Sequence, residues 1–280
     1  GDGATKAAKK IGSALLGIGK AAITAGATTV SAMATASVKM YADYEQNIGG
    51  VETLFKDAAG TVEQFANNAF KTAGLSANQY METVTGFSAR LLQGLGGDTE
   101  KAAQIGNMAV EDMSDNVNKM GVSMESVQNA YQGFAKQNYQ MLDNLHLGYG
   151  QGQAEMARLI NDSGVLGDTM QVTADTVNSV SFDKIVEAIH KVQEGMGITG
   201  TTAKEAATTI SGSARMMRAS WDNLLTGLGS GDEIDELINN LVDSIKTFGQ
   251  NAIPVFKSAF KGLAEVVTEL APIIAAELPQ

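Results

Sequence analysis

Apolar residues recur at three- and four-residue steps along most of the chain, which is the spacing of one face of an α-helix. The longest such run lies between Thr202 and Gly229 and predicts one continuous helix of about seven turns. Thr202 and Glu205 are spaced as a capping box at its start, and Gly229 is placed to end it in a left-handed conformation. The residues that we expect this helix to bury in a core are Ile210, Met217, Trp221, Leu224 and Leu228.

Glycines separate the amphipathic segments, and polar capping residues open several of them. The pair Gly49-Gly50 is expected to break the first helix. Gly74 is predicted to end the next one, and Ser76 with Gln79 forms a capping box for the helix that follows. Further helix starts are predicted at Asp98, Ser123, Ser181 and Asp232, and a further helix end at Gly121.

These patterns predict an all-α fold: an array of amphipathic helices with glycine-punctuated caps, preceded by a long Ala/Gly-rich N-terminal helix. The polar stretch of residues 161–180 is the expected break in the helical body, and Pro254 suits the first turn of a final helix. We therefore divide the chain into an Ala/Gly-rich helix with basic flanks (1–46), a helical body (47–180), a second helical part with the Trp-containing helix (181–250) and a C-terminal amphipathic helix (251–280).

Residues 11–38 are rich in small side chains and contain one charged residue, Lys20. Their eight larger aliphatic residues favour membrane insertion by roughly −2 to −5 kcal/mol, and Lys20 opposes it by up to about 3.5 kcal/mol. Insertion is therefore marginal, and the segment is interpreted as a closely packed helix, a conditional membrane helix or a flexible leader. Small residues that would let another helix approach closely recur at Gly17, Ala21, Ala25 and Thr29.

Charge is segregated along the chain. Residues 1–40 carry a net charge of +4 and residues 41–280 a net charge of −15, which gives the total of −11. Because so acidic a body repels phosphate groups, we expect it not to bind nucleic acid directly. Only the N-terminal segment has the sign to meet DNA or an anionic membrane. The chain contains no cysteine, so disulfides and cysteine nucleophiles are excluded.

Motifs that would carry chemistry are incomplete. Gly19-Lys20 suggests a phosphate-binding loop, but alanines occupy positions where that motif requires Gly and Ser or Thr. His190 shares a helix face with Glu187 and Glu194, a trio that could hold a divalent ion but is better interpreted as a solvated, salt-bridged surface. The other acidic residues fall on faces that we expect to be solvated. We therefore predict no enzyme activity, no cofactor and no metal site.

Several runs of the chain resemble one known family, and they lie at residues 41–55, 74–81, 119–125, 130–150, 197–206 and 221–227. Among them, the run Met141–Gly150 and the run Thr199–Gly227, taken together, are the most specific. Together they resemble the tail tape-measure proteins of long-tailed bacteriophages and prophages, over about residues 41–278. The chain begins at Gly1, and we expect it to be a segment of a longer protein.

The resemblance implies a structural, non-enzymatic role. Tape-measure proteins lie as a few parallel copies inside the tail tube, set tail length during assembly, and leave ahead of the DNA during infection. The expected partners are further copies of the chain, the tail tube protein, the tail assembly chaperones and the host membrane. The expected locations are the tail lumen of the virion and, during assembly, the bacterial cytoplasm. The alternatives are a membrane-active, pore-forming protein that inserts through residues 11–38 and a peptidoglycan hydrolase, for which no acid–base pair stands out.

Overall fold

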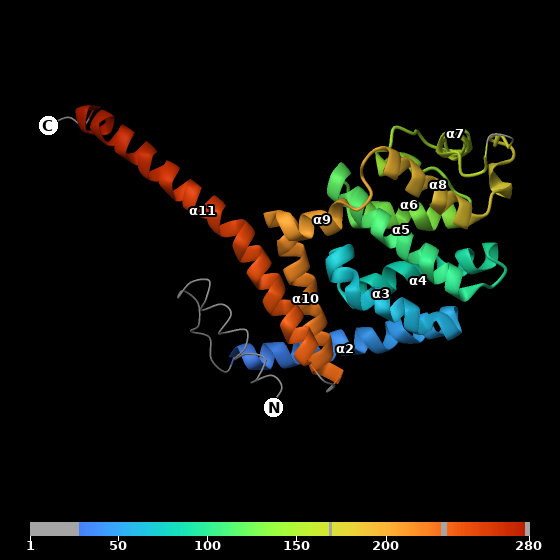
Figure 1. Cartoon of the computed structure of the whole chain (residues 1–280), viewed down its shortest axis with the longest axis horizontal. Helices are drawn as coiled ribbons and strands as arrows, with labels where there is room; N and C mark the ends of the chain where they lie inside the picture. Colours follow the sequence, from blue (N-terminus) through green and yellow to red (C-terminus); the bar gives the residue numbers. More distant parts are fainter. Residues whose placement is uncertain (1–27, 168–169, 231–233, 278–280) are drawn as a thin grey trace.

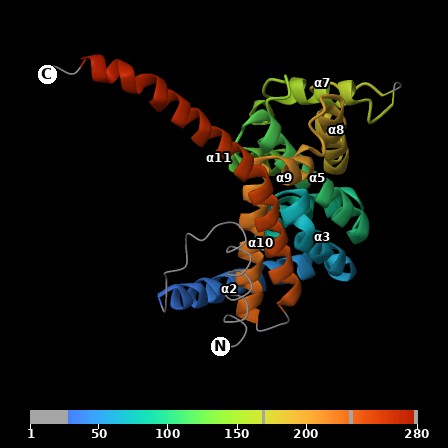
Figure 2. The same cartoon turned by 60° about the vertical axis from the view of Figure 1, so that its left-hand side comes forward.

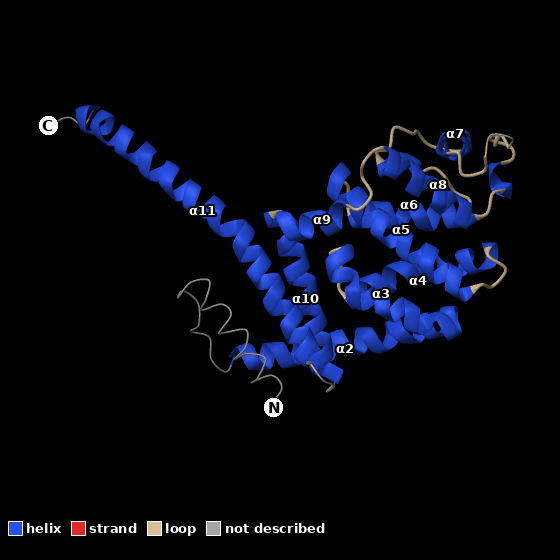
Figure 3. Cartoon of the chain, viewed as in Figure 1, coloured by secondary structure: helices blue, strands red, loops and turns tan. Residues whose placement is uncertain are grey.

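The structure, a computed structural model, describes residues 28–167, 170–230 and 234–277. Across these residues the regular elements are helices and no strand occurs, so the predicted all-α class is confirmed (Figure 3). The α-helices are α2 (Thr28–Phe55), α3 (Ala59–Thr72), α4 (Ala77–Gly94), α5 (Thr99–Met120), α6 (Met124–Ala135), α7 (Gln153–Ser163), α8 (Phe182–Gly195), α9 (Thr201–Thr208), α10 (Ile210–Ser230) and α11 (Asp235–Glu277). Short 3₁₀ turns cover Lys56–Ala58, Leu142–Leu145 and Val177–Ser179.

Most of the predicted helix caps are confirmed. Ser76 and Gln79 form a reciprocal capping box at the start of α4, and Gly74 before them has a left-handed φ of 65°. Asp98 caps α5 by accepting a hydrogen bond from the backbone N–H of Lys101 at 3.0 Å. The remaining confirmed caps are Gly121 at the end of α5 and Ser123 at the start of α6. Such caps depend on residues three or four positions apart, which the sequence displays directly.

One hydrophobic core joins the second half of α2 to α3, α4, α5, α6, α7 and α8. Aromatic rings lie at its centre, with neighbouring ring centroids 5.9–6.3 Å apart. Residues 161–180, the expected break, contribute to this core because Val177 is fully buried in it. The Asn161 side chain also accepts a hydrogen bond from the backbone N–H of Val172 and donates one to its carbonyl. The break was therefore wrongly predicted, and the core continues to Ile198.

Helix α2 does not break at Gly49-Gly50, as the sequence predicted, but continues to Phe55. Val51 and Phe55 are fully buried in the main core, and burying them outweighs the helix penalty of about 1 kcal/mol for each glycine. The boundary drawn between residues 46 and 47 therefore falls inside one helix. Of the predicted small-residue positions, Thr29 lies in the first turn of α2. Gly17, Ala21 and Ala25 lie outside the described residues.

The predicted single helix from Thr202 to Gly229 is two helices, because Thr209 has an extended backbone between α9 and α10. The Thr209 hydroxyl accepts a hydrogen bond from the backbone N–H of Gly212 at 3.0 Å and so caps α10. A β-carbon at Gly212 would lie 2.2 Å from the Glu205 carbonyl oxygen, so only glycine allows the two helices to turn this closely. The predicted Thr202 cap was also wrong, since Gly200 is the N-cap of α9.

Helix α10 crosses α2 and then pairs with α11. Gly229 was predicted to end a helix in a left-handed conformation, but it lies within α10, which ends at Ser230. A β-carbon at Gly229 would lie 2.4 Å from the backbone oxygen of Ser37, so this glycine allows α10 to approach α2 closely. Its role is therefore tertiary packing and not helix termination.

Helices α10 and α11 are antiparallel and contact each other at seven-residue intervals. The Ser213 hydroxyl accepts from Asn251 at 3.2 Å, and the Ser220 and Ser244 hydroxyls lie 2.8 Å apart. Seven residues further along α10, Gly227 lies so close to Leu237 that a β-carbon would be 2.3 Å from it. From one contact to the next, the residue number rises by seven on α10 and falls by seven on α11. The two helices are therefore paired in one antiparallel register.

Helix α11 is continuous for 43 residues and contains Pro254 in its interior. The sequence-based prediction that Pro254 lies in the first turn of a helix is therefore wrong. Elongating an existing helix is easier than nucleating a new one, so the chain stays helical through the proline. The boundary drawn between residues 250 and 251 thus falls inside α11. The predicted cap Asp232 lies outside the described residues. The second half of α11 leaves the body and ends far from it (Figures 1 and 2).

Candidate functional site

Helix α5 carries buried polar side chains that join it to four other elements. Asn116 donates from Nδ2 to the Leu145 carbonyl at 2.8 Å, and Asn118 is hydrogen-bonded to Arg215 on α10. Asp112 and Asp115 are 1% and 3% exposed, so the prediction of solvated acidic faces is wrong for both. A buried carboxylate requires compensating partners, and each of these two has them on a different helix.

Asp115 holds the start of α9. Its carboxylate oxygens accept hydrogen bonds from the backbone N–H groups of Gly200 at 2.5 Å and Thr202 at 2.7 Å. These N–H groups belong to a helix start, where donors lack partners within the helix and the helix dipole is positive. The carboxylate therefore caps α9 from outside, over a separation of 85 residues or more in the chain. The sequence gives no local signal for such a cap.

Asp112 pairs with His190 on α8. His190 Nδ1 lies 2.9 Å from Oδ1 and 3.0 Å from Oδ2 of the Asp112 carboxylate. Burial raises the pKa of the Asp112 carboxyl to about 6, and the hydrogen bond with His190 opposes this rise. The hydrogen bond that His190 makes to the Asp112 carboxylate in turn raises the pKa of His190, against a smaller lowering by burial. The pair therefore binds a proton more readily in the folded chain than its members would in water.

The surface that was predicted around His190 divides into separate pairs. Glu187 forms an ion pair with Lys184 at 2.5 Å, and Glu194 forms one with Lys191 at 2.7 Å. The predicted salt-bridged surface is therefore confirmed for Glu187 and Glu194, but it was wrong for His190, which is directed to Asp112 instead. Within the part of the chain that the structure describes, no group of three or more His, Cys, Asp and Glu side chains has the geometry to hold a metal ion.

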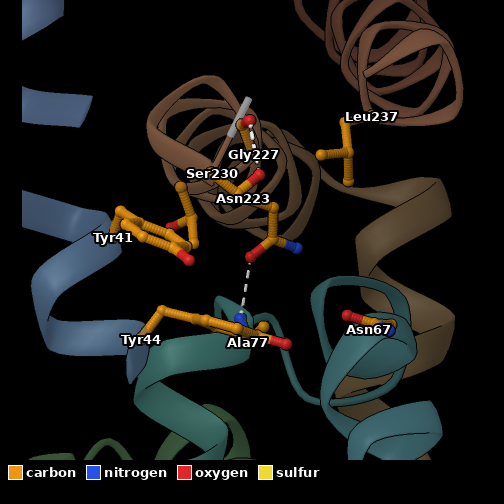
Figure 4. Close-up of a pocket in the computed structure, with 9 residues that line it drawn as sticks. Tyr41, Tyr44, Asn67, Ala77, Asn223, Gly227, Ser230 and Leu237 are labelled. Carbon is orange, nitrogen blue, oxygen red and sulfur yellow. Dashed lines mark hydrogen bonds between the residues drawn. The ribbon is translucent and has the colours of Figure 1, made fainter. Parts of the chain in front are cut away.

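A second polar contact joins α10 to the start of α4. Asn223 Oδ1 accepts a hydrogen bond from the backbone N–H of Ala77 at 2.8 Å, beside the stacked rings of Tyr41 and Tyr44 (Figure 4). A pocket of about 150 Å³ lies here, which is smaller than the several hundred Å³ usual for small-molecule sites. Its lining contains no carboxylate, lysine, arginine or histidine, and its polar groups are tyrosine and serine/threonine hydroxyls and asparagine amides. The other lining residues are Asn67, Thr226, Gly227, Ser230 and Leu237.

The predicted core residues of α10 occupy three environments. Leu224 is fully buried with Ile238, Leu241 and Ile245, while Met217, Trp221 and Leu228 pack around this cluster and are partly buried. Ile210 is 37% exposed, and its prediction as a core residue was wrong. The reason is the turn at Thr209, which directs α9 away from the first residue of α10. The buried positions that the apolar pattern missed are mostly small or polar, and they are Gly212, Ser213, Met216, Ala219, Ser220, Asn223 and Leu225.

Comparison with known proteins finds no family model, no curated protein and no solved structure that matches the chain. None of the helices among the described residues is long and apolar enough to cross a membrane. One partner of several contacts that join the helices lies in the sequence runs singled out above, whereas Asp112, Asp115, Asn116 and His190 lie outside them. Ala77, Leu145, Gly200, Thr202 and Asn223 all lie in such runs.

Proposed function

We propose that the chain is a segment of a phage tail tape-measure protein, a structural protein that sets tail length during assembly and assists DNA delivery. The observation that carries the proposal is the position of the resembling runs. Four of them contribute the backbone or side-chain groups that fix one helix against another, such as Asn223 on Ala77 and Asp115 on Thr202. A protein whose role is to hold a shape is expected to place its characteristic residues at such joints.

The architecture supports the same role. Helix α11 has 43 residues and would span about 65 Å at 1.5 Å per residue, and its second half projects from the body (Figure 1). A rod attached to a folded body suits a component that contacts other proteins along a tube. The carboxylates of Asp112 and Asp115 are hydrogen-bonded to groups on other helices, which supports a structural role for these two buried residues.

The proposed partners are further copies of the chain, the tail tube protein, the tail assembly chaperones and, during infection, the host membrane. Exposed Val255 and Phe256 on α11 support a need for chaperones, since exposed apolar side chains promote aggregation before assembly. The acidic body supports a role without direct DNA binding, because its net charge of −15 repels DNA. The proposed locations are the tail lumen and, before assembly, the bacterial cytoplasm.

The proposal is tested in the strain whose prophage or phage encodes the chain. Tails are purified and their proteins are quantified by mass spectrometry, and the chain is expected at a few copies per tail. Absence of the chain from purified tails contradicts the proposal, as does a gene far from the tail-tube and tail-chaperone genes.

Tail length provides the second measurement. An in-frame duplication of residues 253–273 is expected to lengthen the tail by about 30 Å, at 1.5 Å of helix rise per residue. The duplication of 21 residues adds whole heptads and so preserves the helical face. A double substitution on the outer face of α11, Ser258→Ala with Lys257→Ala, serves as the control and leaves the length unchanged. Unchanged length in the duplication variant contradicts a ruler role for this segment.

A further inference from the structure

The pocket beside Tyr41 and Tyr44 lies where several helices meet. Residues of α2, α3, α4, α10 and α11 all contribute to its lining (Figure 4). Its volume of about 150 Å³ excludes a drug-sized ligand, but a protein cavity of about that size can hold benzene. The pocket opens to solvent, so a single six-membered ring can enter it either free or as the end of a longer chain.

A nearly buried hydrogen-bond donor is directed into this pocket. Asn223 is 8% exposed, and its Oδ1 accepts a hydrogen bond from the backbone N–H of Ala77 at 2.8 Å. Because that N–H can only donate, the amide oxygen must face Ala77 and the Nδ2 group must face away from it. Figure 4 shows Nδ2 on the side of Leu237 and Asn67. Among the residues that the structure describes, none accepts a hydrogen bond from this Nδ2 group, which points to an acceptor on a ligand.

The other polar groups of the lining are uncharged and complement this donor. The Thr226 hydroxyl donates a hydrogen bond to the Asp222 carbonyl at 3.1 Å, so toward the pocket it can only accept. Asn67 is exposed, and its amide can both donate and accept beside the pocket. A charged ligand would be buried here without an opposite charge, which is unfavourable. The lining therefore fits an uncharged ligand whose polar groups both donate and accept, as hydroxyl groups do.

The apolar part of the lining suits a ring. The Tyr41 and Tyr44 rings are stacked, with their centroids 6.3 Å apart and an angle of 17° between their planes. Leu237 lies across the pocket from them (Figure 4). Aromatic rings pack well against apolar C–H groups, and a sugar ring presents C–H groups on its faces and hydroxyl groups at its edge. A purely apolar ring would instead leave the Asn223 Nδ2 group without an acceptor.

We propose that this pocket binds a single uncharged sugar ring. An oxygen of the sugar accepts a hydrogen bond from Asn223 Nδ2, a hydroxyl of the sugar donates one to Thr226, and a C–H face packs on Tyr41. The ring belongs either to a free monosaccharide or to the end of a glycan chain, because the two share this chemistry. The inference goes beyond the proposed structural role and does not depend on it, since the pocket is formed within one chain.

The first experiment titrates the nitrogen-15-labelled full chain with glucose and with N-acetylglucosamine, and follows the side-chain amide signals by NMR. Ligands of this size bind weakly, so we expect dissociation constants of about 1–10 mM. The largest shift is expected at the side-chain amide of Asn223. The variant Asn223→Asp identifies that signal by its loss, while its carboxylate still offers the backbone N–H of Ala77 an acceptor.

A matched pair of threonine variants tests the location of binding. Thr226→Leu fills the pocket with apolar atoms, and Thr53→Leu makes the same change at an exposed position of α2 outside the pocket. Each natural threonine hydroxyl donates to the carbonyl four residues earlier, so both variants lose the same local hydrogen bond. We expect a dissociation constant at least about 10-fold higher for Thr226→Leu and an unchanged one for Thr53→Leu. Circular dichroism verifies that both variants remain folded.

A saturable shift at Asn223 that is lost in Thr226→Leu and retained in Thr53→Leu supports the proposal. If Thr226→Leu does not fold, the shift at Asn223 in the natural chain still locates the site. Short linear oligomers of the same sugars distinguish the two sources, because they bind as tightly as the single sugar only if the pocket takes a glycan end.

The proposal is overturned if no sugar shifts the Asn223 signal at concentrations up to about 100 mM, or if the two threonine variants bind equally well. Tighter binding of p-cresol, an analogue of the tyrosine side chain, at the same signal also overturns it and assigns the pocket to a side chain of a partner protein. The presence of the chain in tails affects none of these results.

Discussion

The carboxylate of Asp115 accepts a hydrogen bond from the backbone N–H of Thr202 at 2.7 Å, so a residue near the C-terminal end of α5 fixes the start of α9. The same carboxylate accepts from Gly200, and both Asp115 and Thr202 are almost completely buried. Since α9 has only eight residues, its own hydrogen bonds do little to hold it in place. Its orientation, and with it the corner at Thr209, depends on this external cap.

Replacing Asp115 with alanine is therefore expected to reduce the free energy of unfolding by about 2–4 kcal/mol, because two buried N–H groups lose their acceptor. The control is Asp98→Ala, which removes an exposed cap of the ordinary local kind and is expected to cost about 1 kcal/mol. Urea denaturation followed by circular dichroism measures both. Equal losses for the two variants would show that the buried cap contributes no more than a surface one.

The pair of Asp112 and His190 predicts that stability decreases as pH rises. The folded pKa of Asp112 is about 6 against an ordinary value of 3.8, so its contribution is fully present below pH 3.8 and is lost as the pH rises through 6. The pKa of His190 is also raised, above 6.5, so its contribution is present below pH 6.5 and is lost as the pH rises through the raised value. For both groups, loss of the proton as the pH rises reduces the free energy of unfolding.

The comparison is between the natural chain and Asp112→Asn, with urea denaturation at pH 5 and pH 8. The natural chain is expected to lose more stability over this interval, by up to about 1.4 kcal/mol per pH unit for each extra proton that the folded state binds. Asp98→Asn, at an exposed position, serves as the control and keeps the natural slope. If Asp112→Asn shows the same slope as the natural chain, the pair does not bind the additional proton.

A substitution at Gly212 tests the close turn between α9 and α10, and a substitution at Gly60 in α3 serves as its control. Gly212→Ala is expected to destabilise the chain by about 2–4 kcal/mol, because its β-carbon would lie 2.2 Å from the Glu205 carbonyl oxygen and the backbone must move. Gly60→Ala in α3 has open space around the new β-carbon and is expected to stabilise by up to about 1 kcal/mol. Thermal unfolding of the two variants measures the difference. A neutral Gly212→Ala would mean that the corner is looser than described.

Local features of this fold could be predicted from the sequence. The capping box of Ser76 and Gln79 and the helix end at Gly121 depend on groups a few residues apart, and both were predicted correctly. Their free energy comes from hydrogen bonds made within the segment, so distant residues do not change them.

The features that were missed depend on distant residues. Gly49-Gly50 remains helical because Val51 and Phe55 are buried by other helices, and Thr209 interrupts a helix because Gly212 permits a close turn. Asp112 resembles any other acidic residue on a helix until His190, 78 residues later, is placed beside it. The apolar pattern likewise could not reveal the small and polar residues that α10 buries, because their burial depends on how closely α2 and α11 approach.

The exposure of three residues predicts their order of importance in the pairing of α10 with α11. Leu224 is fully buried, Trp221 is partly buried and Ile210 is 37% exposed. Leu224→Ala is therefore expected to cost about 2–5 kcal/mol, as for other buried leucines. Trp221→Ala, with only part of its ring removed from water, should cost about 1.5–3 kcal/mol, and Ile210→Ala under about 1 kcal/mol. Urea denaturation followed by circular dichroism ranks the three without relying on tryptophan fluorescence. A larger loss for Trp221→Ala than for Leu224→Ala would place the indole ring, rather than the leucine, at the centre of this helix pair.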